Sequence, residues 1–279
     1  MGLYAIAVWL LCGLVTDHLW LQFACFVISS YLMVELNNSN ALIRIYSRMV
    51  SCSFIMMVCM STFLLQSSKG MMLSICVVMS FVMAFLSYQD KYSMGRIFYS
   101  FMSIGIGSMI DVSVLFFVPV MWLAMFFHLQ SMTLRTFISS LFGLICPYWF
   151  VAVYLIYTND ITLAVEHFSQ LAVFGKVANF SQVPVSALVS ICYVTILSVV
   201  GIIHYLRNRV FDKTRTRMFY NTFILFDIFT IAFIILQPQH YATMLIILIV
   251  TTSPLIAHFI ALTHTWITNL AFKVIVATA

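Results

Sequence analysis

The feature that most constrains this chain is a set of long, almost uninterrupted apolar runs. The clearest four cover Met71–Leu86, Leu141–Tyr157, Val185–Ile203 and Tyr241–Ile260, which are 16 to 20 residues long. A helix needs about 20 apolar residues to cross the hydrocarbon core of a bilayer. Inside hydrocarbon only helices and closed barrels satisfy their backbone hydrogen bonds, and these runs lack the alternating polarity of barrel strands. The runs therefore predict membrane-spanning helices.

The composition excludes a soluble fold. Of the 279 residues, 63% are hydrophobic and 8% are charged, whereas a soluble domain has roughly 25% charged residues. The 13 Lys and Arg and the 8 Asp and Glu residues are too few to cover a water-facing surface. We therefore expect an all-α, polytopic transmembrane helix bundle that forms one integral membrane domain over residues 1–279.

Polar residues divide the chain into 10 to 11 apolar spans. The expected connections on one side of the membrane lie near 35–48, 88–96, 128–136 and 206–217, and a longer loop, 158–183, lies on the other side. A last apolar stretch begins near Asn269 and is too short to cross a bilayer by itself. The other expected spans are 2–16, 19–34, 49–66, 71–87, 97–110, 112–127, 137–157, 184–205, 218–236 and 241–262.

The basic residues predict the orientation of these spans in the membrane, because short cytoplasmic loops are enriched in Lys and Arg. The loop 206–217 holds five basic residues, so we place it in the cytoplasm; the alternation of spans then puts ten basic residues on that side and Lys69 and Lys176 on the other. The N-terminus is expected to be cytoplasmic. The net charge of +5 is explained by contact with anionic lipids and needs no nucleic-acid partner. The ten residues are Arg44, Arg48, Lys91, Arg96, Arg135, Arg207, Arg209, Lys213, Arg215 and Arg217.

The long loop 158–183 contains a helical pattern of its own. Its apolar residues recur at helical spacing, while most of its polar residues fall on other faces. We expect one helix lying in the outer interface of the membrane; a lid that binds a partner is the alternative. The apolar positions are Ile161, Ala164, Val165, Phe168 and Leu171.

Asp227 is the ionisable residue that stands out, because it lies in the middle of an apolar span, in the segment NTFILFDIFTIAF. An ionised side chain at the bilayer centre costs about 2.5 to 3.5 kcal/mol on insertion scales. We therefore expect Asp227 to face the bundle interior or a water-filled cavity, or to stay protonated. A proton or ion relay is the functional interpretation. The structural alternative is a neutral aspartic acid hydrogen-bonded to a neighbouring helix.

Two aspartates are expected at turns on the external side. Asp17 and His18 lie between the first two spans, and Asp111 lies between two later spans. Together they are weak candidates for a catalytic site, because an external aspartate near the end of the first span serves as a base in membrane glycosyltransferases that act on polyprenyl-linked sugars. The loop after the first span has about two residues and lacks the longer helical excursion of those enzymes. The alternative is a pair of turns at the headgroup boundary.

Arg44 and Arg48 form a candidate phosphate or lipid-headgroup site. They follow the polar segment ELNNSNALIRIYSRM and are four residues apart, so in a helix they share one face. A guanidinium binds phosphate oxygens in a bidentate way. The alternative is that both side chains extend toward lipid headgroups.

The sequence predicts no metal site and no cofactor. Its seven cysteines lie in apolar runs without a C-x-x-C pair, and its seven histidines form no H-E-x-x-H pattern. His258 and His264 are isolated in the sequence. Phosphate-loop and dinucleotide motifs are also missing from the sequence.

Four segments carry a resemblance to a known family. They are ELNNSNALIRIYSR at 35–48, FYSFMSIGIGSMIDVSVLFFVPVMW at 98–122, LRTFISSLFGLICPYWF at 134–150 and IAHFIALTHTWITNLAFKV at 256–274. With these segments the chain resembles a family of uncharacterised multi-pass membrane proteins of the Bacteroidota. The resemblance implies the inner membrane of a Gram-negative cell envelope and implies no activity.

Three functions from different classes follow. The first is the handling of a lipid-linked envelope substrate, which rests on Asp17 and Asp111 and on the two arginines. The second is a non-catalytic scaffold or assembly subunit, which is supported by the scarcity of polar intramembrane residues. The third is a proton-coupled transporter of a small solute that uses Asp227, with helices kinked at Pro119 and Pro147. The expected partners are membrane lipids, other membrane proteins or a polyprenyl-linked substrate.

Overall fold

The structure is a computed structural model that describes residues 1–158, 161–173, 175 and 177–262. Over these residues it contains α- and 3-10 helices and no strand, which confirms the all-α prediction. The stretch expected from Asn269 onward lies outside the described residues, as do Asp160 and Lys176. The α-helices are α1 (Gly2–Leu11), α2 (Trp20–Asn40), α3 (Met49–Met60), α4 (Thr62–Leu65), α5 (Ser68–Phe85), α6 (Met94–Ile110), α7 (Phe117–Phe127), α8 (Leu134–Thr158), α9 (Ile161–Ser169), α10 (Val185–Asn208), α11 (Thr214–Leu236) and α12 (Tyr241–Ala261).

Each of the ten expected spans from residue 2 to residue 262 coincides with a helix or a pair of helices. Six helices in the described part of the chain are long and apolar enough to cross a membrane, namely α2, α5, α8, α10, α11 and α12. The apolar helices α1, α3 and α7 are shorter. The protein is therefore a multi-pass membrane protein, and the total of ten or eleven crossings stays a prediction.

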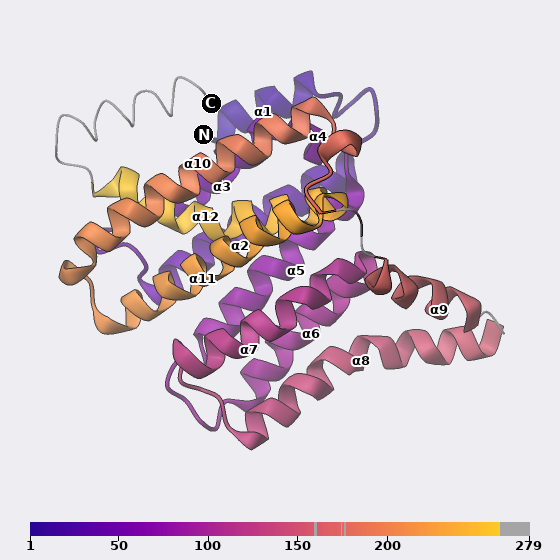
Figure 1. The fold of residues 1–279 in the computed structure, drawn as a ribbon. Helices are drawn as coiled ribbons and strands as arrows, with labels where there is room; N and C mark the ends of the chain where they lie inside the picture. Colours follow the sequence, from indigo (N-terminus) through magenta and orange to yellow (C-terminus); the bar gives the residue numbers. More distant parts are fainter. Residues whose placement is uncertain (159–160, 174, 176, 263–279) are drawn as a thin grey trace.

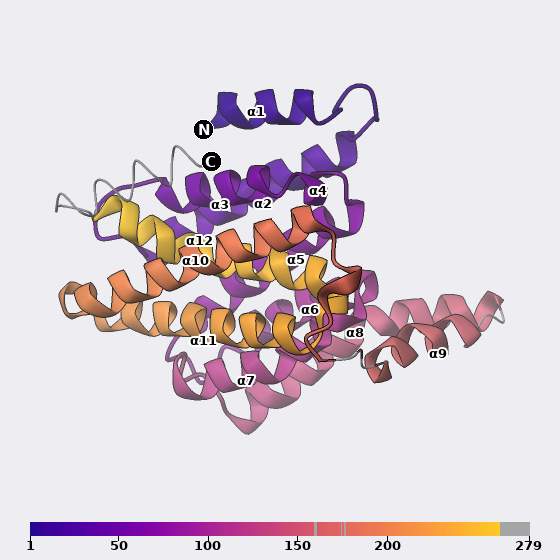
Figure 2. The same ribbon diagram turned by 45° about the horizontal axis from the view of Figure 1, so that its top comes forward.

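Helix α12 is the core of the bundle (Figures 1 and 2). It packs against α3, α5, α10 and α11, and 89% of its most apolar 18-residue segment is buried. It can be surrounded in this way because apolar residues occupy every side of the helix between Met244 and Val250. Helix α8 has the opposite environment: it packs mainly against α6, and only 11% of its most apolar 18-residue segment is buried.

The loops gather at two ends of the bundle, as the charge pattern predicts (Figure 1). At one end, Arg215 Nη2 donates to Asn40 Oδ1 at 3.3 Å, and the backbone N–H of Gln89 donates to the carbonyl of Leu129 at 2.8 Å. We call this end, formed by the loops 41–48, 86–93, 128–133 and 209–213 and the helix turns next to them, the basic end. The ten basic residues expected on one side all lie at this end.

The opposite end holds the other connections. Gly175 N–H donates to Gln237 Oε1 at 2.8 Å, and His167 Nε2 donates to the carbonyl of Ser108 at 2.9 Å. The second of these bonds ties α9 to the end of α6. The helix expected in the loop 158–183 is thus confirmed as α9, which packs against the last turns of α8. Its position in a membrane interface stays a prediction.

One local expectation is wrong. Residues 35–40 belong to α2 and not to a loop. The side chains of Ser39 and Asn40 donate to the carbonyls of Glu35 and Leu36 one turn before them, so these polar groups find their partners within the helix. The helix ends at Asn40, and the next residue, Ala41, has a φ of 47°, which lies in the left-handed region. Pro119 lies in the first turn of α7 and Pro147 lies inside α8, and the expected kinks at these prolines stay predictions.

Helices α6 and α8 approach closely at two glycines, as small residues allow in membrane bundles. A Cβ atom at Gly143 of α8 would overlap the carbonyl oxygen of Phe98, and one at Gly105 of α6 would lie 2.7 Å from the carbonyl oxygen of Leu144. Both contacts are with backbone atoms, so the helices would have to separate to make room for a side chain.

We expect Gly143→Ala to lower the free energy of unfolding by about 1 to 3 kcal/mol, the usual cost of overpacking. Unfolding in mixed micelles measures this loss. Gly95→Ala is the matched control, because a Cβ there meets no atom within 4 Å, and it should leave stability unchanged or slightly raised. Equal stabilities of the two variants would contradict the close α6–α8 contact.

Candidate functional site

Asp227 lies in the interior of the bundle. It belongs to the face of α11 that packs on α12, and its relative exposure is 0%. This placement confirms the expectation that a carboxylate in mid-span avoids lipid. It also fixes the neighbours of Asp227, which come from α10 and α12.

Three hydroxyl groups surround the carboxylate of Asp227. Ser198 of α10 donates to Oδ2 at 2.5 Å, and Thr252 of α12 donates to the same oxygen at 3.1 Å. Thr251 of α12 is hydrogen-bonded to Oδ1. A buried polar group needs hydrogen-bond partners to offset the loss of water. The three hydroxyl groups supply these partners for Asp227.

The hydroxyl group of Thr251 can form a hydrogen bond with Asp227 in either protonation state of Asp227, without a change in the position of Oγ1. Its single hydroxyl proton has three acceptors within reach, because Oγ1 also lies 2.9 Å from the carbonyl of Ile247 and 3.2 Å from that of Leu248. When Asp227 is ionised, Thr251 donates to Oδ1. When Asp227 is protonated on Oδ1, the carboxylic acid donates to Oγ1 and Thr251 donates to a backbone carbonyl.

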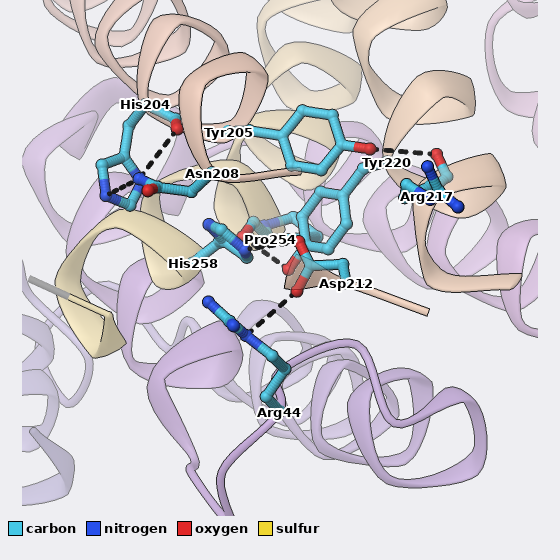
Figure 3. A network of polar contacts seen from close by, with 9 residues as sticks. All are labelled: Arg44, His204, Tyr205, Asn208, Asp212, Arg217, Tyr220, Pro254 and His258. Carbon is cyan, nitrogen blue, oxygen red and sulfur yellow. Dashed lines mark hydrogen bonds and ion pairs between the residues drawn. The ribbon is translucent and has the colours of Figure 1, made fainter. Parts of the chain in front are cut away.

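A second buried polar site lies at the basic end (Figure 3). Asp212 Oδ1 forms an ion pair with Arg44 Nε at 3.1 Å, and its Oδ2 accepts a hydrogen bond from His258 Nε2 at 3.1 Å. The side chains of Asp212 and His258 are fully buried, while that of Arg44 is 37% exposed. The loops before α3 and α11 and the last turns of α12 thus meet here, and we call Arg44, Asp212 and His258 the ionic cluster.

Aromatic rings enclose the ionic cluster on the side of α10 and α11. The rings of Tyr205 and Tyr220 stack with their centroids 4.8 Å apart, and the Tyr220 ring lies 5.1 Å from that of His258. The His204 ring is 5.5 Å from the His258 ring. Burial raises the cost of every unpaired charge in this region, so the pairing of Asp212 is strongly favoured.

Several buried polar atoms around the ionic cluster have no hydrogen-bond partner among the described residues. They are Nδ1 of His204, Nδ1 of His258, Nε of Arg217 and Oδ1 of Asp212, the last of which has only the ion pair to Arg44. Buried polar atoms in proteins are generally satisfied by protein groups or by ordered water. These atoms gather around Asp212 and His258 at the basic end.

Helix α12 joins the two sites. Thr251 and Thr252 contact Asp227, and His258 contacts Asp212. Six residues separate Thr252 from His258, which is roughly 9 Å along a helix axis. Between them, the hydroxyl of Tyr220 donates to the carbonyl of Pro254 at 3.4 Å. Polar groups therefore follow one another along the buried helix from the basic end to the middle of the bundle.

The structure separates the two arginines that the sequence analysis paired. Residues 41–48 are not helical, so Arg44 and Arg48 share no helical face. Arg44 is engaged with Asp212 and lies over the ring of Phe211, 5.6 Å from its centroid. Arg48 precedes the first residue of α3. Binding of a phosphate or lipid headgroup by this pair stays a prediction.

The two aspartates expected on the external side are not joined by any hydrogen bond or ion pair in the described part of the chain. Asp17 is exposed in the turn after α1. Asp111 accepts hydrogen bonds from the backbone N–H of Ser113 at 2.9 Å and from the hydroxyl groups of Ser113 and Thr243. Burial raises the pKa of Asp111, but these bonds outweigh it and hold the pKa below the ordinary value. A carboxylate of lowered pKa is a weak base, which disfavours a catalytic role.

The described residues contain no group of three or more His, Cys, Asp or Glu side chains that could hold a metal ion. His264, which the sequence analysis considered beside His258, lies outside the described residues. Comparisons with protein-family models, curated proteins and solved structures found no match. The geometry of the two buried sites is therefore the basis for a functional proposal.

Proposed function

We propose that this multi-pass membrane protein is a proton-coupled carrier and that Asp227 is its proton-binding group. The observation that carries the proposal is the set of hydroxyl groups around a fully buried carboxylate, one of which can either donate to it or accept from it. Ionisable residues inside a membrane bundle are rare and costly, and they mark substrate and ion pathways and proton relays. A group that must bind and release protons needs partners suited to both states.

The ionic cluster supplies the connection to the aqueous phase. With Nε2 of His258 donating to Asp212, Nδ1 of the ring has no hydrogen-bond partner among the described residues. Nδ1 can therefore bind a water molecule that enters past the partly exposed Arg44. The groups along α12 then lead toward Thr252 and Asp227. Water molecules between them would complete the path, because the gaps exceed the length of one hydrogen bond.

Infrared spectroscopy of the protein in lipid nanodiscs tests this role. We expect a pH difference spectrum to contain the carbonyl band of a buried carboxylic acid, and we expect Asp227→Asn to remove it. Thr251→Val should shift the band, because a partner in both protonation states is lost. Thr243→Val is the matched control on the same helix, since Thr243 contacts Asp111. A wild-type spectrum whose carboxylic acid bands all persist in Asp227→Asn would reject the proposal.

A scaffold or assembly subunit is the second candidate function. It is favoured by α8, a spanning helix whose most apolar 18-residue segment is only 11% buried. The exposed face of α8 could bind a partner. Copurification of a stoichiometric partner in mild detergent would support it. Catalysis on a lipid-linked envelope substrate has less support, because no described contact brings Asp17 and Asp111 together.

We also propose that the protein lies in a bacterial inner membrane with its basic end in the cytoplasm. The division of charge between the two ends supports this orientation, and the resemblance to the Bacteroidota family supports the location. Phosphatase fusions test it: we expect a fusion after Asn179 to be active and one after Lys213 to be inactive. The reverse pattern would show that the orientation is inverted.

A further inference from the structure

An apolar groove lies between α10 and α11 on the half of these helices nearer the opposite end. Its volume is about 440 Å³. From α10 it is lined by Leu188, Ile191, Cys192, Thr195 and Ile196, and from α11 by Ile231, Ile234 and Ile235. Phe180, from the loop before α10, completes the lining. Thr195 carries the only hydroxyl group in this set.

The groove exists because α10 and α11 each pack on α12 more extensively than on one another (Figures 1 and 2). The loop before α10 bounds it toward the opposite end, where Ala178 N–H donates to the carbonyl of Ile235 at 3.1 Å. At the mouth, Ile196 and Ile235 are 61% and 50% exposed on the outer surfaces of two spanning helices. In a membrane this surface faces hydrocarbon, so the groove opens sideways into the bilayer.

The inner end of the groove adjoins the site of Asp227. Thr195 lies three residues before Ser198 on α10, and Ile231 lies four residues after Asp227 on α11. Residues three or four apart lie on the same face of a helix. The groove therefore ends one helical turn from the hydrogen bond between Ser198 and Asp227.

The dimensions of the groove suit one hydrocarbon chain of a lipid in one leaflet of the bilayer. Leu188 and Ile196 are eight residues apart, which is roughly 12 Å of helix. Half of the hydrocarbon core of a bilayer is about 15 Å deep. A volume near 440 Å³ also falls within the range of small-molecule sites, about 300 to 1,000 Å³. A straight hydrocarbon chain that enters from the leaflet at the opposite end would reach the depth of Asp227.

We infer that the groove between α10 and α11 binds the acyl chain of a membrane phospholipid, which places this lipid beside the proton-binding carboxylate. Apolar walls, a lateral opening and a depth of one leaflet all match an acyl chain. The assignment of that lipid as the carried substrate rests on the proposed function, whereas binding of the chain does not. A carrier with this arrangement takes its substrate from the bilayer and not from water.

A photoreactive phospholipid with a diazirine near the end of its acyl chain tests the inference in nanodiscs. After illumination, mass spectrometry should locate cross-links on residues 188–196 and 231–235, well above those at Val153 and Ile156 on the exposed face of α8. Thr195→Trp should fill the inner end and abolish the cross-links in both helices. Ile203→Trp is the matched control, because Ile203 is exposed on α10, does not line the groove and lies two helical turns beyond Thr195. Ile231→Trp repeats the test from α11.

Uniform labelling of all exposed helices, or labelling that survives both groove substitutions, would overturn the inference. So would labelling by a photoreactive prenyl phosphate in place of the phospholipid. The infrared band of Asp227, recorded on the wild-type protein, separates the two proposals. If the band titrates but the groove is not cross-linked, only the lipid site is removed. If the groove is cross-linked specifically but Asp227 gives no titrating band, the proton-coupled function is removed.

Discussion

Replacement of Asp227 by asparagine is expected to abolish proton movement through the protein while leaving insertion and folding intact. The asparagine side chain has nearly the same shape, and its oxygen can still accept from Ser198 and Thr252, whose hydroxyl groups contact Oδ2. It cannot bind and release a proton near neutral pH. The structural contribution of the site is therefore largely kept, and the proposed chemistry is lost.

Proteoliposomes made from a total lipid extract, with a pH-sensitive dye inside, measure this effect. A potassium gradient with valinomycin sets the membrane potential, and the internal pH reports proton entry. We expect entry with the wild-type protein and none above empty liposomes with Asp227→Asn. Asp111→Asn makes the same chemical change at a carboxylate bonded by Ser113 and Thr243, and it should retain proton entry. Equal rates for wild type and Asp227→Asn would contradict the role of Asp227.

Replacement of Asp212 by alanine should give the largest loss of stability. Asp212 is fully buried and pairs with both Arg44 and His258. Removal of one partner from a buried ion pair leaves an uncompensated charge and costs about 3 to 5 kcal/mol; we expect the lower end, about 3 kcal/mol, because Arg44 is partly exposed. Unfolding in mixed micelles at neutral pH measures the loss.

Two comparisons make this test specific. Asp90→Ala removes the pair between Asp90 and Arg96, whose side chains are 42% and 52% exposed, and exposed pairs contribute at most about 1 kcal/mol. The double variant Arg44→Met with Asp212→Leu should recover part of the lost stability, since both charges are gone. If Asp212→Ala were as mild as Asp90→Ala, the ionic cluster would not be a buried ion pair.

The helices and the burial of Asp227 could be predicted from the sequence. The apolar runs place helices at all ten expected positions, because in hydrocarbon the backbone has few alternatives. Asp227 lies in the middle of such a run, and the cost of exposing a carboxylate to lipid directs it inward. Its partners Ser198, Thr251 and Thr252 could not be predicted, because helix packing depends on contacts that one sequence does not display.

The ionic cluster was missed because its members lie far apart in the chain. Arg44, Asp212 and His258 come from three separate segments, and no spacing in the sequence connects them. One signal was available: Asp212 is the only acidic residue among the five cations of the loop 206–217. A lone carboxylate in a basic loop suggests an ion pair. Arg44 was assigned to phosphate because the helical spacing with Arg48 assumed a helix that does not form there.

Charge movement after a pH jump tests the central claim most directly. On a solid-supported membrane, a proton that enters the membrane interior displaces charge and produces a transient current. The proposed function predicts such a current for the wild-type protein, its loss in Asp227→Asn and its retention in Asp111→Asn. A current of the same size in Asp227→Asn and the wild type would show that protons do not reach Asp227, and Asp227 would then be a structural residue.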